Sequence, residues 1–181
     1  CRLLTVDGAD DPYEANNTAS GTIGIVGRFP FYRMVVEKGT GTWCQYCPRG
    51  IWGFEKMMEK YPDNFVGIAV HKNEDTYGRY GLECSSYNAL TFSSYPSAYV
   101  NRNPRMNVSP IPAVLEAAYQ ATCGDLRLGE VNVKSELVNS NTINATATTT
   151  FVSDINNADY SISFVLTEDN VSGYYQSNGC K

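Results

Sequence analysis

The stretch Gly41-Thr42-Trp43-Cys44-Gln45-Tyr46-Cys47-Pro48-Arg49-Gly50 joins two segments of different hydrophobic period. Before it, Arg33–Glu37 has the apolar character of a buried strand. After it, apolar residues recur at helical spacing up to Pro62, namely Ile51, Phe54, Met57 and Met58. Two thiols separated by two residues can close a small disulfide ring where a strand is followed by a helix. The junction therefore predicts a redox site.

The helix N-terminus assigns a different role to each thiol. Its partial positive charge and unbonded N–H groups stabilise a thiolate, which is the nucleophile in thiol–disulfide exchange. We expect Cys44 to be the attacking sulfur and Cys47, one turn deeper in the helix, to be the resolving sulfur. Pro48 suits a first helical turn because it gives up only an N–H that has no helical partner there.

A CxxC pair has other uses. A zinc site needs about four ligands, usually from a second CxxC or a histidine pair, but the chain has one histidine, His71, and no second CxxC. A copper(I) carrier lacks extra Met or His ligands here. We therefore expect no metal and no cofactor. A structural disulfide between Cys44 and Cys47 remains the open alternative.

Residues 31–123 alternate between strand and helix patterns, which predicts an α/β domain. A probable second helix has its apolar face at Tyr77, Tyr80, Cys84 and Tyr87. The other elements expected after the first helix are the strands Phe65–Val70, Ser97–Arg102 and Met106–Val108 and the helix Pro112–Cys123.

The remaining parts of the chain have a different composition. Residues 124–181 carry 3 basic and 7 acidic side chains and alternate apolar with polar residues, which predicts a small antiparallel β module, sandwich-like but thin for a sandwich by itself. The alternating residues are Val131, Val133, Ser135 and Leu137, then Ile143, Ala145 and Ala147, then Tyr160, Ile162, Phe164 and Leu166. Residues 1–30 form an N-terminal extension with a strand candidate at Thr22–Arg28.

A second motif, Ser94-Tyr95-Pro96-Ser97-Ala98-Tyr99-Val100, places a proline at the entrance to a strand. Together with the CxxC junction, the chain resembles the thioredoxin superfamily. The resemblance implies a thioredoxin-like domain, a central mixed sheet flanked by helices, over residues 31–123. It also implies that Pro96 is cis and packs beside the dithiol, and that Tyr95 offers its backbone to an extended substrate. Trp43, Tyr95 and Pro96 are accordingly the expected substrate-binding residues.

A closer resemblance rests on residues 41–50 followed by Phe65-Val66-Gly67-Ile68-Ala69-Val70-His71. These stretches are similar to the outer-membrane-protein-28-related family of the Bacteroidetes, and the similarity covers roughly residues 33–123. It implies an exported or lipid-anchored protein, in the periplasm or at the outer membrane of a Gram-negative bacterium, with β-rich modules beside the thioredoxin-like domain.

One position departs from the pattern of the thioredoxin superfamily. Many thioredoxins carry a buried carboxylate six residues before the first cysteine, where it aids proton transfer to the resolving thiol. Here that position is Lys38, and Glu37 comes one residue earlier. Glu37 is therefore the candidate proton relay; the alternative is an exposed charge at a strand end, paired with Lys38.

Six cysteines in 181 residues favour an oxidising compartment. Cys1 is either the lipidated residue of a bacterial lipoprotein or a trimmed boundary. Cys84, on an apolar stripe, is expected to be a buried small hydrophobe. The sequence does not choose among the pairings of Cys1, Cys84, Cys123 and Cys180.

The composition limits the classes of partner. A net charge of −5 argues against a nucleic-acid partner, because binding to the phosphate backbone requires clustered Lys and Arg. No apolar run approaches the roughly 18 residues of a membrane span, so membrane contact is expected only through a lipid anchor. The sequence favours a thiol–disulfide oxidoreductase acting on cysteine-containing exported proteins, with a redox partner protein. The alternative is a non-enzymatic outer-membrane or surface binding protein.

Overall fold

The computed structural model describes residues 5–6, 9–10, 13, 15, 18–21, 27–77, 82–85, 87, 90–156 and 159–177. Most of the strand candidate Thr22–Arg28 lies outside these residues, as do Cys1, Tyr80 and Cys180. Near the N-terminus, β1 (Thr5–Val6) pairs with β2 (Ala9–Asp10) in antiparallel fashion.

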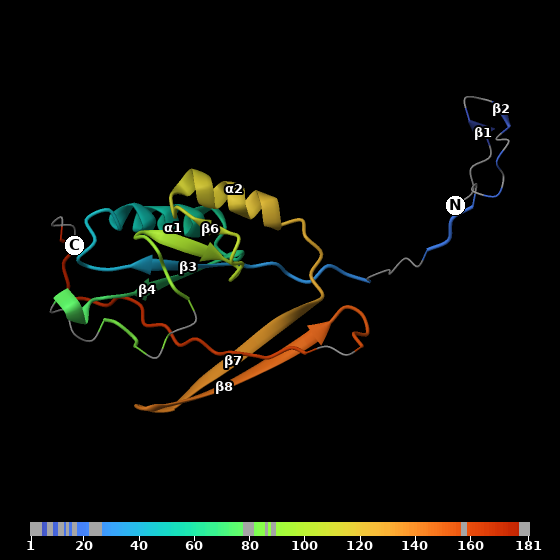
Figure 1. Cartoon of the computed structure of the whole chain (residues 1–181). Coiled ribbons are helices and arrows are strands. Elements are labelled where there is room, and N and C mark those ends of the chain that lie inside the picture. Colours follow the sequence, from blue (N-terminus) through green and yellow to red (C-terminus); the bar gives the residue numbers. More distant parts are fainter. Residues whose placement is uncertain are drawn as a thin grey trace.

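The centre of the molecule is a mixed four-stranded sheet with the order β4-β3-β5-β6 (Figure 1). β3 runs parallel to β4 and antiparallel to β5, which in turn pairs antiparallel with β6. These strands are β3 (Met34–Thr40), β4 (Phe65–His71), β5 (Ser97–Val100) and β6 (Asn107–Val108). All four strands predicted for this region are confirmed.

Both long helices cover the same face of this sheet (Figure 1). α1 (Pro48–Lys60) connects β3 to β4, and α2 (Pro112–Thr122) follows β6; each has a proline in its first turn, where no backbone donor is needed. Because alternate residues of a strand share a face, the even-numbered residues of β3 meet the helices. The resulting core contains Met34, Val36, Phe54, Met57, Phe65, Ala98, Val100, Leu115 and Ala118.

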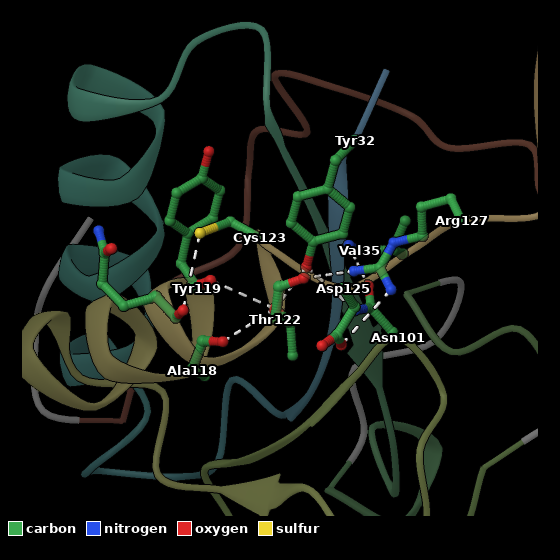
Figure 2. Close-up of polar contacts among 10 residues, drawn as sticks. Tyr32, Val35, Asn101, Ala118, Tyr119, Thr122, Cys123, Asp125 and Arg127 are labelled. Carbon is green, nitrogen blue, oxygen red and sulfur yellow. Dashed lines mark hydrogen bonds and ion pairs between the residues drawn. The ribbon is translucent and has the colours of Figure 1, made fainter. Parts of the chain in front are cut away.

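A polar cluster fixes the end of α2 to the start of β3 (Figure 2). The Tyr32 hydroxyl lies 2.6 Å from Thr122 Oγ1 and accepts a hydrogen bond from Asn101 Nδ2 at 3.1 Å. Asn101 Oδ1 in turn accepts from the backbone N–H of Val35 at 3.0 Å. The Arg127 guanidinium lies 4.3 Å from the centre of the Tyr32 ring and donates to the Thr122 carbonyl. These contacts hold α2 at a defined position on the sheet.

The opposite face of the sheet is covered differently from the prediction. A Cβ built on Gly39 would lie 2.4 Å from the Phe92 ring, so only glycine admits this packing. The predicted second helix through Tyr77 and Tyr87 is wrong: within the described part of that segment, only the short 3-10 helix η2 (Asp75–Tyr77) is helical. Among the residues that the structure describes, long helices therefore flank one face of the sheet only.

The C-terminal third forms a separate two-stranded antiparallel sheet. β7 (Gly129–Asn139) and β8 (Thr142–Phe151) make a long hairpin, and two hydrogen bonds of 2.8 and 2.9 Å tie Arg28 to Glu130 of β7. The third predicted strand, at 160–166, is wrong: residues 159–169 are described and pair with no strand. No helix among the described residues is both long and apolar enough to cross a membrane.

Candidate functional site

The two cysteines of the motif are joined in a disulfide where β3 passes into α1. Their Cα atoms are 5.4 Å apart, within the usual range for a disulfide. The turn between the elements is built by backbone bonds from Cys44 N–H to the Gly41 carbonyl at 3.0 Å and from Cys47 N–H to the Cys44 carbonyl at 3.2 Å. The strand–turn–helix sequence thus brings the two thiols together as expected.

The position of Cys47 differs from the prediction. We expected it inside the first helical turn, but α1 begins at Pro48 and Cys47 is its N-cap residue. Cys44 lies before the helix, is 5% exposed and lines an open cleft, whereas Cys47 is fully buried. Cys44 is thus the more exposed of the two sulfurs, although the disulfide as a whole is well covered.

Aromatic side chains surround the exposed edge of the disulfide. The Trp43 ring stacks on Tyr77 with centroids 5.2 Å apart, and it meets the edge of Tyr95 at the same distance. Its indole N–H donates to the Lys72 carbonyl at 2.8 Å, which fixes the ring orientation. The cleft beside Cys44 has a volume of about 440 Å³ and is lined by Trp43, Cys44, Gln45, Tyr46, Tyr95 and Ser177.

The second motif meets the first at this cleft. Tyr95 contributes to the cleft wall, and the Tyr95–Pro96 peptide bond is cis, as predicted. Burial raises the pKa of the Tyr95 hydroxyl above its usual value, and the nearby carboxylate of Glu83 acts in the same direction. Trp43 and Cys44 therefore share one cleft with Tyr95, although the two motifs lie about fifty residues apart in the sequence.

Glu37, the candidate proton relay, is not brought to the disulfide. It is fully buried on the face of β3 opposite to α1, where its carboxylate accepts hydrogen bonds from the Arg102 guanidinium at 2.8 to 3.1 Å and from the Tyr87 hydroxyl. The alternative, an exposed charge paired with Lys38, is also wrong, because Arg102 is the partner. This ion pair raises the pKa of Arg102 and keeps it charged.

A buried carboxylate that the sequence did not single out anchors the turn before Cys44. Glu74 is fully buried; Oε1 accepts the Thr42 N–H at 2.7 Å, and Oε2 accepts the Thr42 hydroxyl at 2.6 Å. Nδ1 of His71 lies 2.5 Å from the same Oε1. His71, the last residue of β4, is half-buried in this network. The only sequence signal was a His and a Glu three residues apart after an apolar strand.

The C-terminal segment also reaches the site. After β8 the chain runs back across the molecule towards the start of α1 (Figure 1), and the Ser177 N–H donates to the Thr42 carbonyl at 2.8 Å. Ser177 therefore lines the cleft beside Cys44. No pattern in the sequence indicated this contact.

The remaining cysteines are not core residues where they are described. Cys84 is exposed, so its predicted role as a buried small hydrophobe is wrong. Cys123 is also exposed, and its thiol lies 3.6 Å from the Gln120 carbonyl. Cys1 and Cys180 lie outside the described residues.

Comparison with known proteins gives a likeness of fold. HBP35 of Porphyromonas gingivalis has a similar structure, with a TM-score of 0.53 and 24% sequence identity; the match covers 69% of this chain and 44% of that one. Protein AGR_C_4864 from Agrobacterium tumefaciens also matches, with a TM-score of 0.37, 21% identity and coverage of 59% and 52%. No protein-family model and no curated protein matches the sequence. The chain thus shares a mixed α/β architecture with a longer bacterial protein.

Proposed function

We propose that this chain is a thioredoxin-like thiol–disulfide oxidoreductase that exchanges disulfides with cysteine-containing proteins. The observation that carries the proposal is the Cys44–Cys47 disulfide, which lies at the N-terminus of α1 and beside a cleft whose wall includes Tyr95. The parallel β3–α1–β4 unit, the antiparallel β5–β6 pair and a cis-proline at the start of β5 support the thioredoxin-like assignment.

The proposed chemistry uses the pair in its reduced form. The Cys44 thiolate attacks one sulfur of a client disulfide, and the second client sulfur leaves as a thiolate. Cys47 then attacks the Cys44 sulfur, which releases the first client sulfur and re-forms the disulfide. The client gains two electrons, and the pair loses two. Run in reverse, the same steps oxidise a client, so a redox partner protein determines the direction.

The cleft favours an extended peptide as the bound part of the client. Its lining includes the flat rings of Trp43 and Tyr95, whose centroids lie 5.2 Å apart, and Pro96 follows Tyr95 directly in the chain. Rings of this kind bind apolar side chains with little loss of rotamer freedom. Trp43, Tyr95 and Pro96 are therefore the proposed substrate-binding residues.

The compartment follows from the cysteine content and from the resemblance given above. Six cysteines suit the periplasm or the outer surface better than the reducing cytosol. We infer an exported protein of a Gram-negative bacterium, in the periplasm or at the outer membrane.

One observation favours the alternative of a non-enzymatic binding protein that keeps Cys44–Cys47 as a structural disulfide. The apolar face of the β7–β8 hairpin is exposed, and two-stranded sheets are marginal by themselves. A partner that covers this face would give the hairpin a role in binding. The exposed apolar residues are Val131, Val133, Leu137, Ile143 and Phe151.

A trapping experiment separates the two functions. The Cys47→Ser variant keeps the attacking thiol but loses the resolving one, so mixed disulfides with client proteins of an oxidised periplasmic extract should accumulate. The Cys44→Ser variant serves as the matched control, because it retains one thiol of the pair but should form no such adduct. Absence of adducts with the folded Cys47→Ser protein would favour the binding protein.

A further inference from the structure

Strand β7 has one edge that pairs with no other strand within the described residues. β8 flanks one side of β7, and the order of this sheet, β7-β8, leaves the other side free. Residues 131–139 of β7 are all exposed, and the strand-like residues 159–169 do not fill this edge. A free edge presents a row of N–H and C=O groups with which a further strand can pair. Because two-stranded sheets are marginal by themselves, such a strand would stabilise the hairpin.

The backbone groups of alternate residues of β7 point to this free edge. At the start of the strand, the Val152 N–H donates to the Leu128 carbonyl at 2.9 Å, which sets the phase of the hydrogen-bond ladder. Hydrogen-bonded pairs alternate along an antiparallel ladder, and the register with β8 continues without a shift as far as Leu137. The even-numbered residues of β7 therefore bond to β8. The N–H and C=O groups of Val133, Ser135 and Leu137 face away from it.

The two faces of β7 differ in chemical character. Val133 and Leu137 lie on one face and are 59% and 67% exposed. Lys134 and Glu136 lie on the other face, because successive side chains of a strand alternate between faces. Their cross-strand neighbours in β8 carry no charge, and neither residue is in an ion pair within the described part of the chain. The free edge thus has one cation and one anion without a charged partner.

We propose that the free edge of β7 binds the same edge of a second copy of this chain. The two strands run antiparallel about a two-fold axis at Ser135, which makes the interface self-complementary. Val133 of each copy then lies opposite Leu137 of the other in hydrogen-bonded pairs. Lys134 of each copy lies opposite Glu136 of the other in the closer, non-hydrogen-bonded pairs. The product is a sheet of four strands, two from each copy, with one apolar face.

Charge selects both this register and this partner. Hydrogen bonding across the edge requires odd-numbered residues to lie opposite odd-numbered residues, so the nearest alternative registers place the axis at Lys134 or at Glu136. Each of these sets like charges directly opposite each other, which destabilises a strand pair. The axis at Ser135 is the one of the three that pairs opposite charges. The free edge of β8 has no charged residue and offers no comparable match.

Two charge reversals of opposite sign test this pairing in the full chain. Lys134→Glu sets carboxylates opposite each other, and Glu136→Lys sets ammonium groups opposite each other. We expect the native chain to dimerise in sedimentation equilibrium, and each single variant to raise the dissociation constant by on the order of tenfold or more. A thiol reductant is present throughout, which removes links through the exposed Cys84 and Cys123.

Two combinations of these changes should restore the dimer. The double variant, Lys134→Glu with Glu136→Lys, exchanges the two charges and should associate as the native chain does. An equimolar mixture of the two single variants should form a mixed dimer, because each copy supplies the charge that the other lacks. The matched control is Lys56→Glu on the exposed side of α1, which changes the net charge equally and should leave association unchanged.

Two outcomes of sedimentation would overturn the inference. One is a native chain that stays monomeric up to about 1 mM, since its edge would then have no useful affinity for itself. The other is a dimer that both single variants leave unchanged, because a different surface would then join the copies. In either case the free edge of β7 is left for another segment or another protein.

A cysteine at the proposed axis tests the register. The Cα atoms of a hydrogen-bonded antiparallel pair are about 5.5 Å apart, within the range of a disulfide. Ser135→Cys should therefore link two copies on mild oxidation, and peptide mass spectrometry should find position 135 joined to position 135. The matched control is Ala145→Cys, which lies opposite Ser135 in β8 and away from the free edge of β7, and should not link. Equal linking of the two variants, or none in a Ser135→Cys chain that dimerises, would contradict this register.

Discussion

Thr42 and Glu74 are joined by two hydrogen bonds, one from the Thr42 N–H and one from its hydroxyl, to the two oxygens of a single buried carboxylate. Thr42 comes two residues before Cys44, so this pair attaches the turn that carries the disulfide to the loop after β4. A carboxylate that accepts several hydrogen bonds tolerates burial. The site is thus held from a part of the chain 32 residues away in sequence.

Replacing Glu74 with Gln should destabilise the protein by about 2–3 kcal/mol, because one of the two acceptor oxygens becomes an NH2 group and the charge that strengthens both Thr42 hydrogen bonds is lost. The matched control is Glu59→Gln on the exposed side of α1, which should change the free energy of unfolding by under about 0.5 kcal/mol. Urea unfolding of both variants measures the difference. Equal stabilities would show that the Thr42–Glu74 pair contributes little.

Replacing Lys38 with Met should stabilise the protein at pH 7 by about 3 kcal/mol. The pKa of Lys38 is lowered from 10.5 to about 8, so protonated Lys38 disfavours the folded state by roughly this amount. The sign follows from proton binding: between pH 8 and 10.5 the unfolded chain holds more protons, so the stability of the native protein rises with pH in that window.

The advantage of Lys38→Met over the native protein should therefore shrink as the pH rises through that window. Urea unfolding of both proteins at several pH values, with Lys56→Met as the control, gives the comparison. A constant difference at all pH values would mean that Lys38 does not titrate in the folded protein as its burial requires.

Replacing Ser177 with Pro should open the cleft beside Cys44, because proline lacks the N–H that donates to the Thr42 carbonyl. Loss of one hydrogen bond of about 1 kcal/mol corresponds to roughly a fivefold change in the accessible population. We expect alkylation of reduced Cys44, followed by peptide mass spectrometry, to speed up by about that factor. Ser177→Ala keeps the N–H and should behave as the native protein does; equal rates in Ser177→Pro would show that the segment does not restrict access.

Trp43→Ala should lower kcat/KM for the reduction of a protein disulfide such as that of insulin by about tenfold, since a large aromatic contact of the client is lost. Trp43→Phe keeps an aromatic ring but loses the bond to the Lys72 carbonyl, so its effect should be smaller. The reduction potential should stay within a few millivolts in both. An unchanged kcat/KM in Trp43→Ala would remove Trp43 from the substrate-binding residues.

Local sequence patterns predicted the strands and helices whose apolar spacing matches their own secondary structure. The apolar period before and after residues 41–50 predicted β3 and α1, and Pro48 and Pro62 marked where that helix begins and stops. The spacing of Tyr77 and Tyr87 resembled a helix, but the Tyr87 hydroxyl instead reaches Glu37 on the sheet. The spacing of tyrosines alone does not distinguish an apolar helix face from a set of hydroxyls that donate hydrogen bonds to buried acceptors.

The incorrect strand prediction within residues 159–169 and the unpredicted burial of Lys38 and Glu74 have a different origin. Tyr160 to Leu166 alternate like a strand, but a strand also needs a neighbour for its backbone, and the described chain offers none. Lys38 and Glu74 are polar residues whose burial depends on Gly50 and Thr42, which are distant in sequence. Such contacts exist only after the chain has folded, so no local pattern records them.

The reduction potential of the Cys44–Cys47 pair tests the proposed function most directly. The full chain is equilibrated with dithiothreitol or glutathione buffers of known poise, and the reduced fraction of this pair is measured by alkylation and mass spectrometry. An exchange catalyst should give a value between about −270 and −120 mV, the range from thioredoxin to DsbA. A value below about −300 mV would identify Cys44–Cys47 as a structural bond and contradict the proposed oxidoreductase.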